Sequence, residues 1–360
     1  MGFRSVHFSG FRNLADGEIN LNAPQIHLIG KNGQGKTNFL EALYLLSYGS
    51  SFRTRHLSEL VRWDSKTMKV YGQIQTPSEP CGTLSVTWND GKKTIQLHGK
   101  NVNDRKELLD RIPTIVFIHD DFLFVSGSPE RRRWFVDQTL SMQDSLYIDQ
   151  LRRFKKALKE RNYLIRNREK NLVEYFSEQL AHAGLAVSKR RGDLIREFGN
   201  FFDSLYREIS GVEETVRLEY FPSWRNAKKI DEVMIILSEN LEKDMEAGIT
   251  GSGPHRDQYK FMTTGRDFAK SASTGQRRLL SLVLRITQAR LYSELTGRKP
   301  LLLLDDVLLE LDTEKRRKFL DRLPEAEQIF YTFLPGEATS RRKWGSIIYE
   351  MKEGVFNDRK

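Results

Sequence analysis

A glycine-rich loop between a short apolar run and a helical run limits the fold more than any other stretch. Residues 30–37 read GKNGQGKT, after the apolar residues 25–29 and before the helical pattern of residues 37–47. Three glycines let successive backbone N–H groups turn toward a phosphate. The helix would point the positive end of its dipole at the same anion. The stretch therefore predicts a buried strand, a phosphate-binding loop and a helix.

The loop and the first turn of the helix supply the expected contacts to a nucleotide. Lys36 places a positive charge on the β- and γ-phosphates, and the hydroxyl of Thr37 binds Mg²⁺. The alternative is a glycine-rich strand–helix turn that binds nothing. The residues expected to contact the nucleotide are Gly30, Lys31, Asn32, Gly33, Gln34, Gly35, Lys36, Thr37 and Asn38.

A second stretch, LLLLDD at residues 301–306, is an apolar strand that ends in two carboxylates. In a P-loop ATPase, one acid at this point holds Mg²⁺ and the next polarises the attacking water. Alternation along a strand sends adjacent side chains to opposite faces, so we expect Asp305 to hold the metal and Asp306 to act in catalysis. The alternative is a pair of acids that caps the following turn. The expected cofactors are ATP and Mg²⁺.

A third stretch, STGQ at residues 273–276, opens a predicted helix just before LLLLDD. This order is similar to ABC-type ATPases, in which a Ser-Gly-Gln turn of one subunit closes over the γ-phosphate held by another. The resemblance implies trans contacts from Ser273, Gly275 and Gln276, although Ser-x-Gly is also an ordinary helix cap. It likewise implies a dimer-contacting D-loop at Glu310 and Asp312. Thr332 lies where such enzymes place a catalytic switch residue, and a threonine is also common in a strand.

The pattern of apolar residues changes along the chain of 360 residues. Short strands are predicted up to residue 120, including a hairpin turn at residues 89–91, and helices without proline follow from 131 to 209. Strands return near Val216, followed by a helix at 228–246 and another at 273–296. We expect an α/β fold: an ABC-type P-loop ATPase head, with a mixed sheet and flanking helices, interrupted by a helical lobe. The expected boundaries are 1–125 and 216–360 for the head and 126–215 for the lobe.

The net charge of +10 favours a polyanionic partner, and several arginines form clusters. The alternative is that these side chains are solvated or paired with acids. No helix-turn-helix or zinc pattern occurs, so for a nucleic-acid partner we expect contacts with the phosphate backbone rather than with bases. A single cysteine, Cys81, and no apolar run of membrane-spanning length favour the cytoplasm. The candidate DNA contacts are Arg53, Arg55, Arg131, Arg132, Arg133, Arg152 and Arg153.

Nearly the whole chain resembles the RecF family, bacterial DNA replication and repair ATPases of the SMC-like branch of the ABC class. The matching segments are GFRNL at 10–14, GKNGQGKTNFLEAL at 30–43, SFRT at 51–54, GSPERRRWFVD at 127–137, LKERNYLI at 158–165, GPHRD at 253–257, STGQRR at 273–278 and LLLLDDVLLELD at 301–312. The resemblance adds Arg12 and Asn13 to the expected nucleotide contacts. The chain departs from the family pattern at Leu309, where serine is usual, and at Arg277, where a second glutamine is usual. No hinge glutamine occurs at residues 115–125, where Asp120 or Asp121 could replace it.

The resemblance implies a weak ATPase that dimerises when ATP is bound and whose hydrolysis resets the dimer. The dimer would clamp duplex DNA near single-strand gaps and, with RecO and RecR partners, promote RecA loading in recombinational repair, replication and the SOS response. A P-loop small-molecule kinase is the alternative, although it has no use for STGQ. An SMC-like structural protein would need far longer helical arms, and an OLD-type nuclease would need a further domain.

Overall fold

A computed structural model describes residues 2–76, 79–109, 111–336 and 345–358 of the chain. The chain forms two compact units, of which the first combines Met1–Asp120 with Tyr292–Lys360 and the second comprises Asp121–Leu291. The first unit is thus interrupted in sequence by the second. Each unit is described by itself below.

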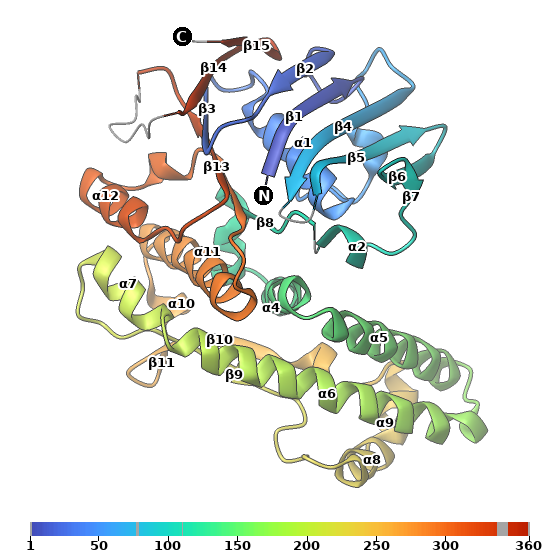
Figure 1. Cartoon of the computed structure of the whole chain (residues 1–360). Helices are drawn as coiled ribbons and strands as arrows, with labels where there is room; N and C mark the ends of the chain where they lie inside the picture. Colours follow the sequence, from blue (N-terminus) through green and yellow to red (C-terminus); the bar gives the residue numbers. More distant parts are fainter. Residues whose placement is uncertain (1, 77–78, 110, 337–344, 359–360) are drawn as a thin grey trace. The chain divides into compact units, whose positions relative to one another are not determined.

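A mostly parallel sheet of six strands carries the glycine-rich loop in the first unit (Figure 1). Four of its five pairings are parallel, and only the edge pair β14–β15 is antiparallel. The strands predicted at 25–29, 301–304 and 328–333 form with those bounds, because continuous apolar runs suit strands buried on both faces. The order across the sheet is β15 (Val355–Asp358), β14 (Ile347–Lys352), β3 (Gln25–Ile29), β13 (Gln328–Phe333), β12 (Leu301–Leu304) and β8 (Thr114–Phe117).

An antiparallel sheet forms the other layer of the first unit. A hairpin turn was predicted at residues 89–91, and the hairpin between β5 and β6 turns through Asp90 and Gly91, with φ values of 47° and 75°. The strand order is β2 (Gly17–Asn20), β1 (Gly2–Ser9), β4 (Thr67–Thr76), β5 (Glu79–Asn89), β6 (Lys92–Leu97) and β7 (Lys100–Asn101). Short α2 (Lys106–Leu109) leads from this sheet to β8.

Helix α1 (Lys36–Tyr48) lies between these two sheets and is buried on almost every side. The ring of Phe39 contacts Phe8 of β1 at 6.0 Å and Phe330 of β13 at 6.1 Å between ring centroids. A helix with apolar residues on most of its faces is buried in the core in this way. The packing fixes the first turn of α1, and with it Lys36 and Thr37, against the ends of the parallel strands.

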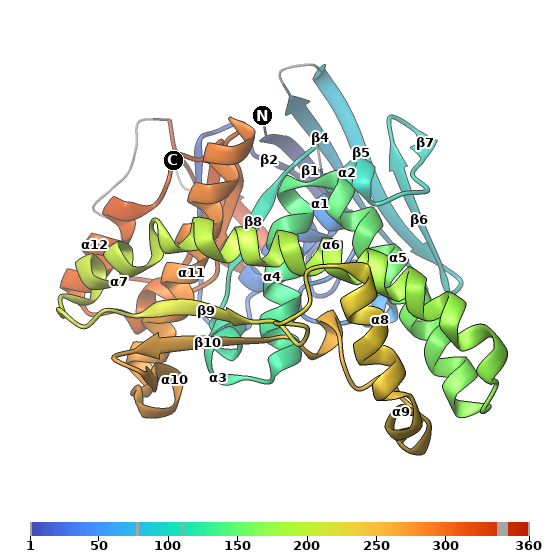
Figure 2. The same cartoon turned by 90° about the horizontal axis from the view of Figure 1, so that it is seen from below.

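The second unit combines helices with a three-stranded antiparallel sheet. The long helices α5 (Ser145–Arg166) and α6 (Val173–Gly199) form the predicted antiparallel pair, visible in Figures 1 and 2. The unit also contains α3 (Leu123–Ser126), α4 (Pro129–Gln143), α7 (Phe202–Ser210), β9 (Arg217–Phe221), α8 (Ile230–Glu239), α9 (Leu241–Ala247), β10 (Gln258–Thr263), β11 (Arg266–Asp267) and α10 (Phe268–Ser271).

The second unit is longer than the helical lobe expected at residues 126–215. The sheet β9–β10–β11 belongs to it because its aromatic face packs on the helices: Phe261 of β10 lies 6.0 Å from Phe202 of α7. From the sequence, the strands predicted after residue 215 are expected to belong to the head. The periodicity of apolar residues predicts the form of a single element. The unit that a sheet joins depends instead on the surface against which its side chains pack.

The prediction of a single continuous helix at residues 228–246 was wrong. The helix expected at 228–246 is two helices, α8 and α9, which meet at Asn240. The side-chain amide of Asn240 donates a hydrogen bond of 2.7 Å to the carbonyl of Ile236, which closes α8 locally. The helix predicted at 273–296 is α11 (Thr274–Thr296), and α12 (Thr313–Arg322) precedes β13. Among the described residues, no helix is both long enough and apolar enough to cross a bilayer.

Candidate nucleotide-binding site

The strand order of the parallel sheet brings three distant segments together at one edge. β13 lies between β3, which leads into the glycine-rich loop, and β12, which leads into Asp305 and Asp306. All three strands are parallel, so their carboxyl ends meet at the edge where α/β sheets bind ligands. Thr332, near the end of β13, therefore lies between the loop and the two acids.

The glycine-rich loop has the backbone that its sequence predicts. Gly33 and Gly35 have φ values of 78° and 105°, which few other residues adopt. A Cβ at Gly30 would meet the carbonyl oxygen of Met351 at 2.7 Å, so the loop also needs glycine where it passes β14. Lys36 is buried, and its Nζ donates to the carbonyl of Gly30 at 2.8 Å. The loop thus fixes the lysine at the base of a cavity.

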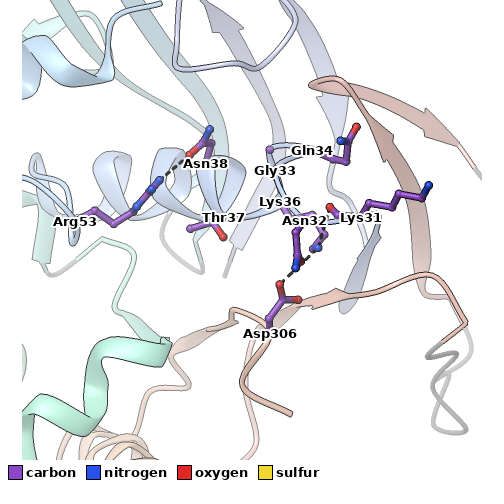
Figure 3. Close-up of a pocket in the computed structure, with 10 residues that line it drawn as sticks. Lys31, Asn32, Gly33, Gln34, Lys36, Thr37, Asn38, Arg53 and Asp306 are labelled. Carbon is purple, nitrogen blue, oxygen red and sulfur yellow. Dashed lines mark hydrogen bonds and ion pairs between the residues drawn. The ribbon is translucent and has the colours of Figure 1, made fainter. Parts of the chain in front are cut away.

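That cavity has a volume of about 350 Å³ and is lined mainly by the loop and the start of α1 (Figure 3). Lys36 Nζ lies 3.5 Å from Oδ2 of Asp306 across it. All of the residues predicted to contact the nucleotide except Gly30, Arg12 and Asn13 line this cavity. The lining residues are Lys31, Asn32, Gly33, Gln34, Gly35, Lys36, Thr37, Asn38, Arg53 and Asp306.

The predicted metal ligands lie next to each other. The hydroxyl of Thr37 donates to the carboxylate of Asp305, at 2.8 Å from Oδ2. Burial raises the pKa of Asp305 to about 6, while the hydrogen bond from Thr37 opposes the rise. Mg²⁺ keeps several water ligands and binds proteins through one or two oxygens plus substrate phosphates. A hydroxyl and a carboxylate in contact, beside a phosphate-binding loop, fit such an ion.

Asp306 adopts a backbone that the strand pattern does not predict. β12 ends at Leu304, and Asp306 has the left-handed values φ 51° and ψ 11°. We expected strand alternation to send the two carboxylates to opposite faces, and this prediction was wrong. The chain leaves the strand between them, and both carboxylates lie near the hydroxyl of Thr332, 2.8 Å from Asp306 Oδ1 and 3.2 Å from Asp305 Oδ1.

A second cavity, of about 860 Å³, shares Asn38 and Arg53 with the first. The predicted contacts Arg12 and Asn13 line it, as does Trp63, whose side chain is fully exposed. Trp63 is not among the site residues predicted from the sequence. Neither is Glu41, a buried carboxylate of α1 that accepts hydrogen bonds from Arg12 and Arg53. A glutamate within the apolar run of α1 is the signal that could have drawn attention to it.

Ser273 of the STGQ turn and Asp312, which is predicted to lie in a D-loop, have local helix-capping contacts. Ser273 caps α11: its Oγ accepts the N–H of Gln276 at 3.2 Å, and Gln276 Oε1 accepts the N–H of Ser273 at 2.8 Å. Gly275 is exposed in the first turn of α11, within the second unit. Asp312 caps α12 by accepting the N–H of Lys315 at 2.8 Å. The side chain of Glu310 lies outside the described residues. These contacts leave Ser273 and Gly275 at the surface of their unit.

Comparisons of the sequence with known proteins indicate one protein family. The family model "RecF/RecN/SMC N terminal domain" matches residues 3–343. The chain is 41% identical over 351 residues to the DNA replication and repair protein RecF of Treponema pallidum (strain Nichols), covering 97% of this chain and 99% of the relative. The chain belongs to the RecF family of SMC-like proteins.

Solved structures give the same fold. The recombination mediator protein RecF with ATP, of the RecFOR pathway, superposes with a TM-score of 0.90 at 28% identity, covering 100% of this chain and 98% of that one. An Smc head bound to the C-winged helix domain of ScpA has a TM-score of 0.57 at 14% identity, covering 99% and 96%. The predicted α/β ATPase head of the ABC class is thereby confirmed.

Within this RecF-family fold, the candidate DNA arginines divide into two groups. Arg132 and Arg133 are partly buried: Arg132 donates to the carbonyl of Val125 at 2.7 Å, and Arg133 donates to the carbonyl of Asp257 at 2.8 Å. Burial also lowers the pKa of Arg132. Both side chains are therefore committed to their own unit. The exposed members are Arg53, Arg55, Arg131, Arg152 and Arg153, of which Arg53 lines the nucleotide cavity.

The candidate replacements for the family's hinge glutamine also differ from each other. Asp121 is fully buried and accepts two hydrogen bonds from Arg285, at 2.7 and 3.1 Å. The guanidinium of Arg285 also lies 4.8 Å from the ring centroid of Phe124. A carboxylate bound in this way is a structural anion of the second unit, whereas Asp120 is exposed.

Proposed function

We propose that this protein is an ATP-dependent DNA-binding protein of recombinational repair. The observation that carries the proposal is the convergence of Lys36, Thr37, Asp305, Asp306 and Thr332 at one sheet edge, although they come from three segments. These groups are what a P-loop ATPase needs to bind and hydrolyse a triphosphate. The named relatives act in DNA replication and repair, and one of them was solved with ATP.

The two neighbouring cavities, which share Asn38 and Arg53, suit the two ends of a nucleotide. The triphosphate would lie over the loop, with its charge balanced by Lys36 and by the backbone N–H groups. Thr37 and Asp305 would hold Mg²⁺, which neutralises phosphate charge when it is bound. The base would extend into the second cavity, where the exposed indole of Trp63 offers a flat apolar surface for stacking.

Asp306 would orient the attacking water, because its carboxylate faces the same cavity as Lys36. Thr332 would hold that carboxylate in position. Catalysis of this kind consists of positioning and charge stabilisation. Slow hydrolysis would suit a protein in which ATP controls assembly and hydrolysis resets it.

The second half of the site would come from another copy of the chain. Ser273 and Gly275 are exposed in the first turn of α11, where backbone N–H groups and the helix dipole can meet a γ-phosphate. Glu310 and Asp312 would contact the partner. The closed dimer would hold duplex DNA near gaps through phosphate contacts, and RecO- and RecR-type partners would help it to promote RecA loading in the cytoplasm.

Light scattering with and without ATP and gapped duplex DNA tests the proposal. We expect a monomer alone, a dimer with ATP, and a dimer–DNA complex with both. Lys36→Arg serves as the control, because it keeps the charge but loses the geometry needed for hydrolysis. A protein that stays monomeric at saturating ATP would contradict the dimeric site. Phosphoryl transfer to a metabolite would instead favour the small-molecule kinase.

A further inference from the structure

Glu41 is a fully buried carboxylate on α1, one helical turn beyond Thr37. Neither nucleotide binding nor hydrolysis, as proposed above, uses it directly. Charged groups are buried only where hydrogen bonds and opposite charges compensate the loss of water. The contacts of Glu41 therefore indicate what the carboxylate is there to hold.

Two arginines and a serine converge on the Glu41 carboxylate. Arg12 binds it with both ends of its guanidinium, through Nε at 3.0 Å and Nη2 at 3.0 Å. Arg53 donates from Nη1 at 3.3 Å, and the hydroxyl of Ser51 donates at 2.5 Å. Paired, planar contacts of this type fix the orientation of a guanidinium as well as its position.

Ser51 links the Glu41 carboxylate to the backbone of its own loop. Its Oγ accepts the N–H of Arg53 at 2.9 Å and the N–H of Thr54 at 3.1 Å, while its proton goes to Glu41. One hydroxyl therefore ties the turn at residues 51–54 to the carboxylate. Glu41 is therefore the charged group of α1 to which both this turn and the Arg53 side chain are bound.

Arg53 also connects this cluster to the phosphate-binding loop. Its Nη1 donates to Oδ1 of Asn38 at 2.7 Å, a contact drawn in Figure 3. Nδ2 of Asn38 donates to Oδ1 of Asn13 at 2.7 Å, and Nδ2 of Asn13 donates to the carbonyl of Gly33 at 3.1 Å. A continuous set of hydrogen bonds thus runs from Glu41 to the backbone of the loop.

From these contacts we infer that Glu41 is a positioning residue for nucleotide binding. It presents Arg53 on the wall of the triphosphate cavity and Arg12 on the wall of the second cavity. The inference rests on the proposed function, because it assumes that these cavities bind ATP. It adds that the affinity for ATP depends on a carboxylate that never touches the nucleotide.

Nucleotide titration of the full-length chain separates this role from a purely structural one. Glu41→Gln keeps the shape of the side chain and removes its charge. We expect the folded variant to bind a fluorescent ATP analogue about tenfold more weakly than the wild type. A purely structural glutamate would lower the melting temperature and leave the affinity of the folded protein unchanged.

A double-mutant cycle with Arg53→Ala identifies the path of the effect. If Glu41 acts largely through Arg53, Glu41→Gln should cost clearly less affinity in the Arg53→Ala background than in the wild type. Fully additive losses would overturn this path. The control is Glu325→Gln, which neutralises an exposed carboxylate that pairs with Lys299 at 2.7 Å; both of these residues lie outside the two cavities.

Ser51→Ala keeps the inference testable if Glu41→Gln does not fold. It removes the link between the turn and the carboxylate without leaving a buried charge unpaired, and we expect a weaker loss of affinity in the same direction. Wild-type affinity in Ser51→Ala, and in Glu41→Gln if that variant folds, would overturn the inference alone. A wild-type protein that binds no ATP would instead overturn the proposed function beneath it.

Discussion

The hydroxyl of Thr332 holds Asp306 at two points. Its Oγ1 accepts the backbone N–H of Asp306 at 2.7 Å and lies 2.8 Å from Oδ1 of the same residue. A left-handed backbone is uncommon for a residue with a side chain and persists where its surroundings fix it. Thr332 is therefore placed to keep Asp306 directed toward Lys36, which lies 3.5 Å from its carboxylate.

Replacing Thr332 by valine should slow hydrolysis more than it weakens ATP binding. Valine keeps the shape and β-branching but removes both contacts to Asp306. We expect the rate of a single turnover to fall about a hundredfold, the effect of losing one positioned polar group in an active site. The matched variant Thr332→Ser keeps the hydroxyl and should stay close to the wild type. Equal rates in the valine and serine variants would show that the hydroxyl has no role.

Neutralising Asp306 should separate ATP-dependent assembly from hydrolysis. Asp306→Asn cannot polarise a water molecule, but it leaves the glycine-rich loop and Asp305 intact. We expect a dimer that forms with ATP and persists for much longer than that of the wild type, measured by light scattering during an ATP chase. Glu18→Gln, at an exposed carboxylate of β2, should behave as the wild type. A variant that stays monomeric at saturating ATP would argue against a site shared by two subunits.

Mixing two inactive variants tests whether the STGQ turn acts on the partner. Ser273→Arg blocks the turn, and Lys36→Arg blocks the loop. In a mixed dimer, one site would combine an intact loop with an intact turn from the other chain. An equal mixture should therefore recover about a quarter of the wild-type activity, since half of the dimers are mixed and each has one good site. No recovery would mean that Ser273 serves its own chain or only caps α11.

Exposure divides the candidate DNA arginines into two experimental classes. Arg152 and Arg153 on α5 are exposed, so their replacement by alanine should weaken DNA binding and change its salt dependence. Each lost phosphate contact makes the slope of log K against log salt less negative by about 0.9. Arg133→Ala should instead lower the melting temperature and leave the slope unchanged, because this arginine donates to Asp257 within its unit. An unchanged slope in the α5 double variant would exclude this helix from the DNA contact.

His255 should make the stability of the protein fall in mild acid. Burial lowers its pKa from 6.5 to about 4, and Arg256, Arg133 and Arg191 add to that effect. The ring is therefore neutral in the native state, with Nε2 donating to the carbonyl of Thr250 at 2.8 Å. The unfolded chain binds a proton near pH 6.5 and the native chain only near pH 4. Stability is thus complete above pH 6.5 and is lost as the pH falls toward 4.

The expected loss in the free energy of unfolding is about 3 kcal/mol between these limits. Denaturant unfolding at pH 7 and at pH 4.5 measures it, with His255→Gln as the comparison, because glutamine can still donate to Thr250 and does not titrate. The variant should lose clearly less stability than the wild type. Asp257, whose pKa burial raises, titrates in both proteins and cancels in the difference. Equal losses in both proteins would exclude His255 as the source.

Local pattern was sufficient for the elements that build the nucleotide site. The strands at 25–29 and 301–304 are short, largely apolar runs, whereas the helix after the glycine-rich loop is a longer one, so run length and neighbouring residues decide their form. The turn at Asp90 and Gly91 is equally local, since glycine tolerates the positive φ that the turn requires. The Gly-Lys-Thr chemistry follows from residue types at fixed spacing.

The tertiary structure decided which of the site residues lie next to one another. The order β3–β13–β12 puts Thr332 between the loop and the two acids, and no local signal specifies which strand lies in the middle of a parallel sheet. The cluster of Glu41, Arg12 and Arg53 combines residues that are separated in the sequence. They meet because α1 is buried between two sheets. Arg133 and Arg153 cannot be distinguished by residue type. Arg133 donates a hydrogen bond within its unit, whereas Arg153 is exposed. The sequence by itself therefore determined the chemistry available to this protein, through local periodicity and residue type. Long-range packing alone decided which of those groups work together.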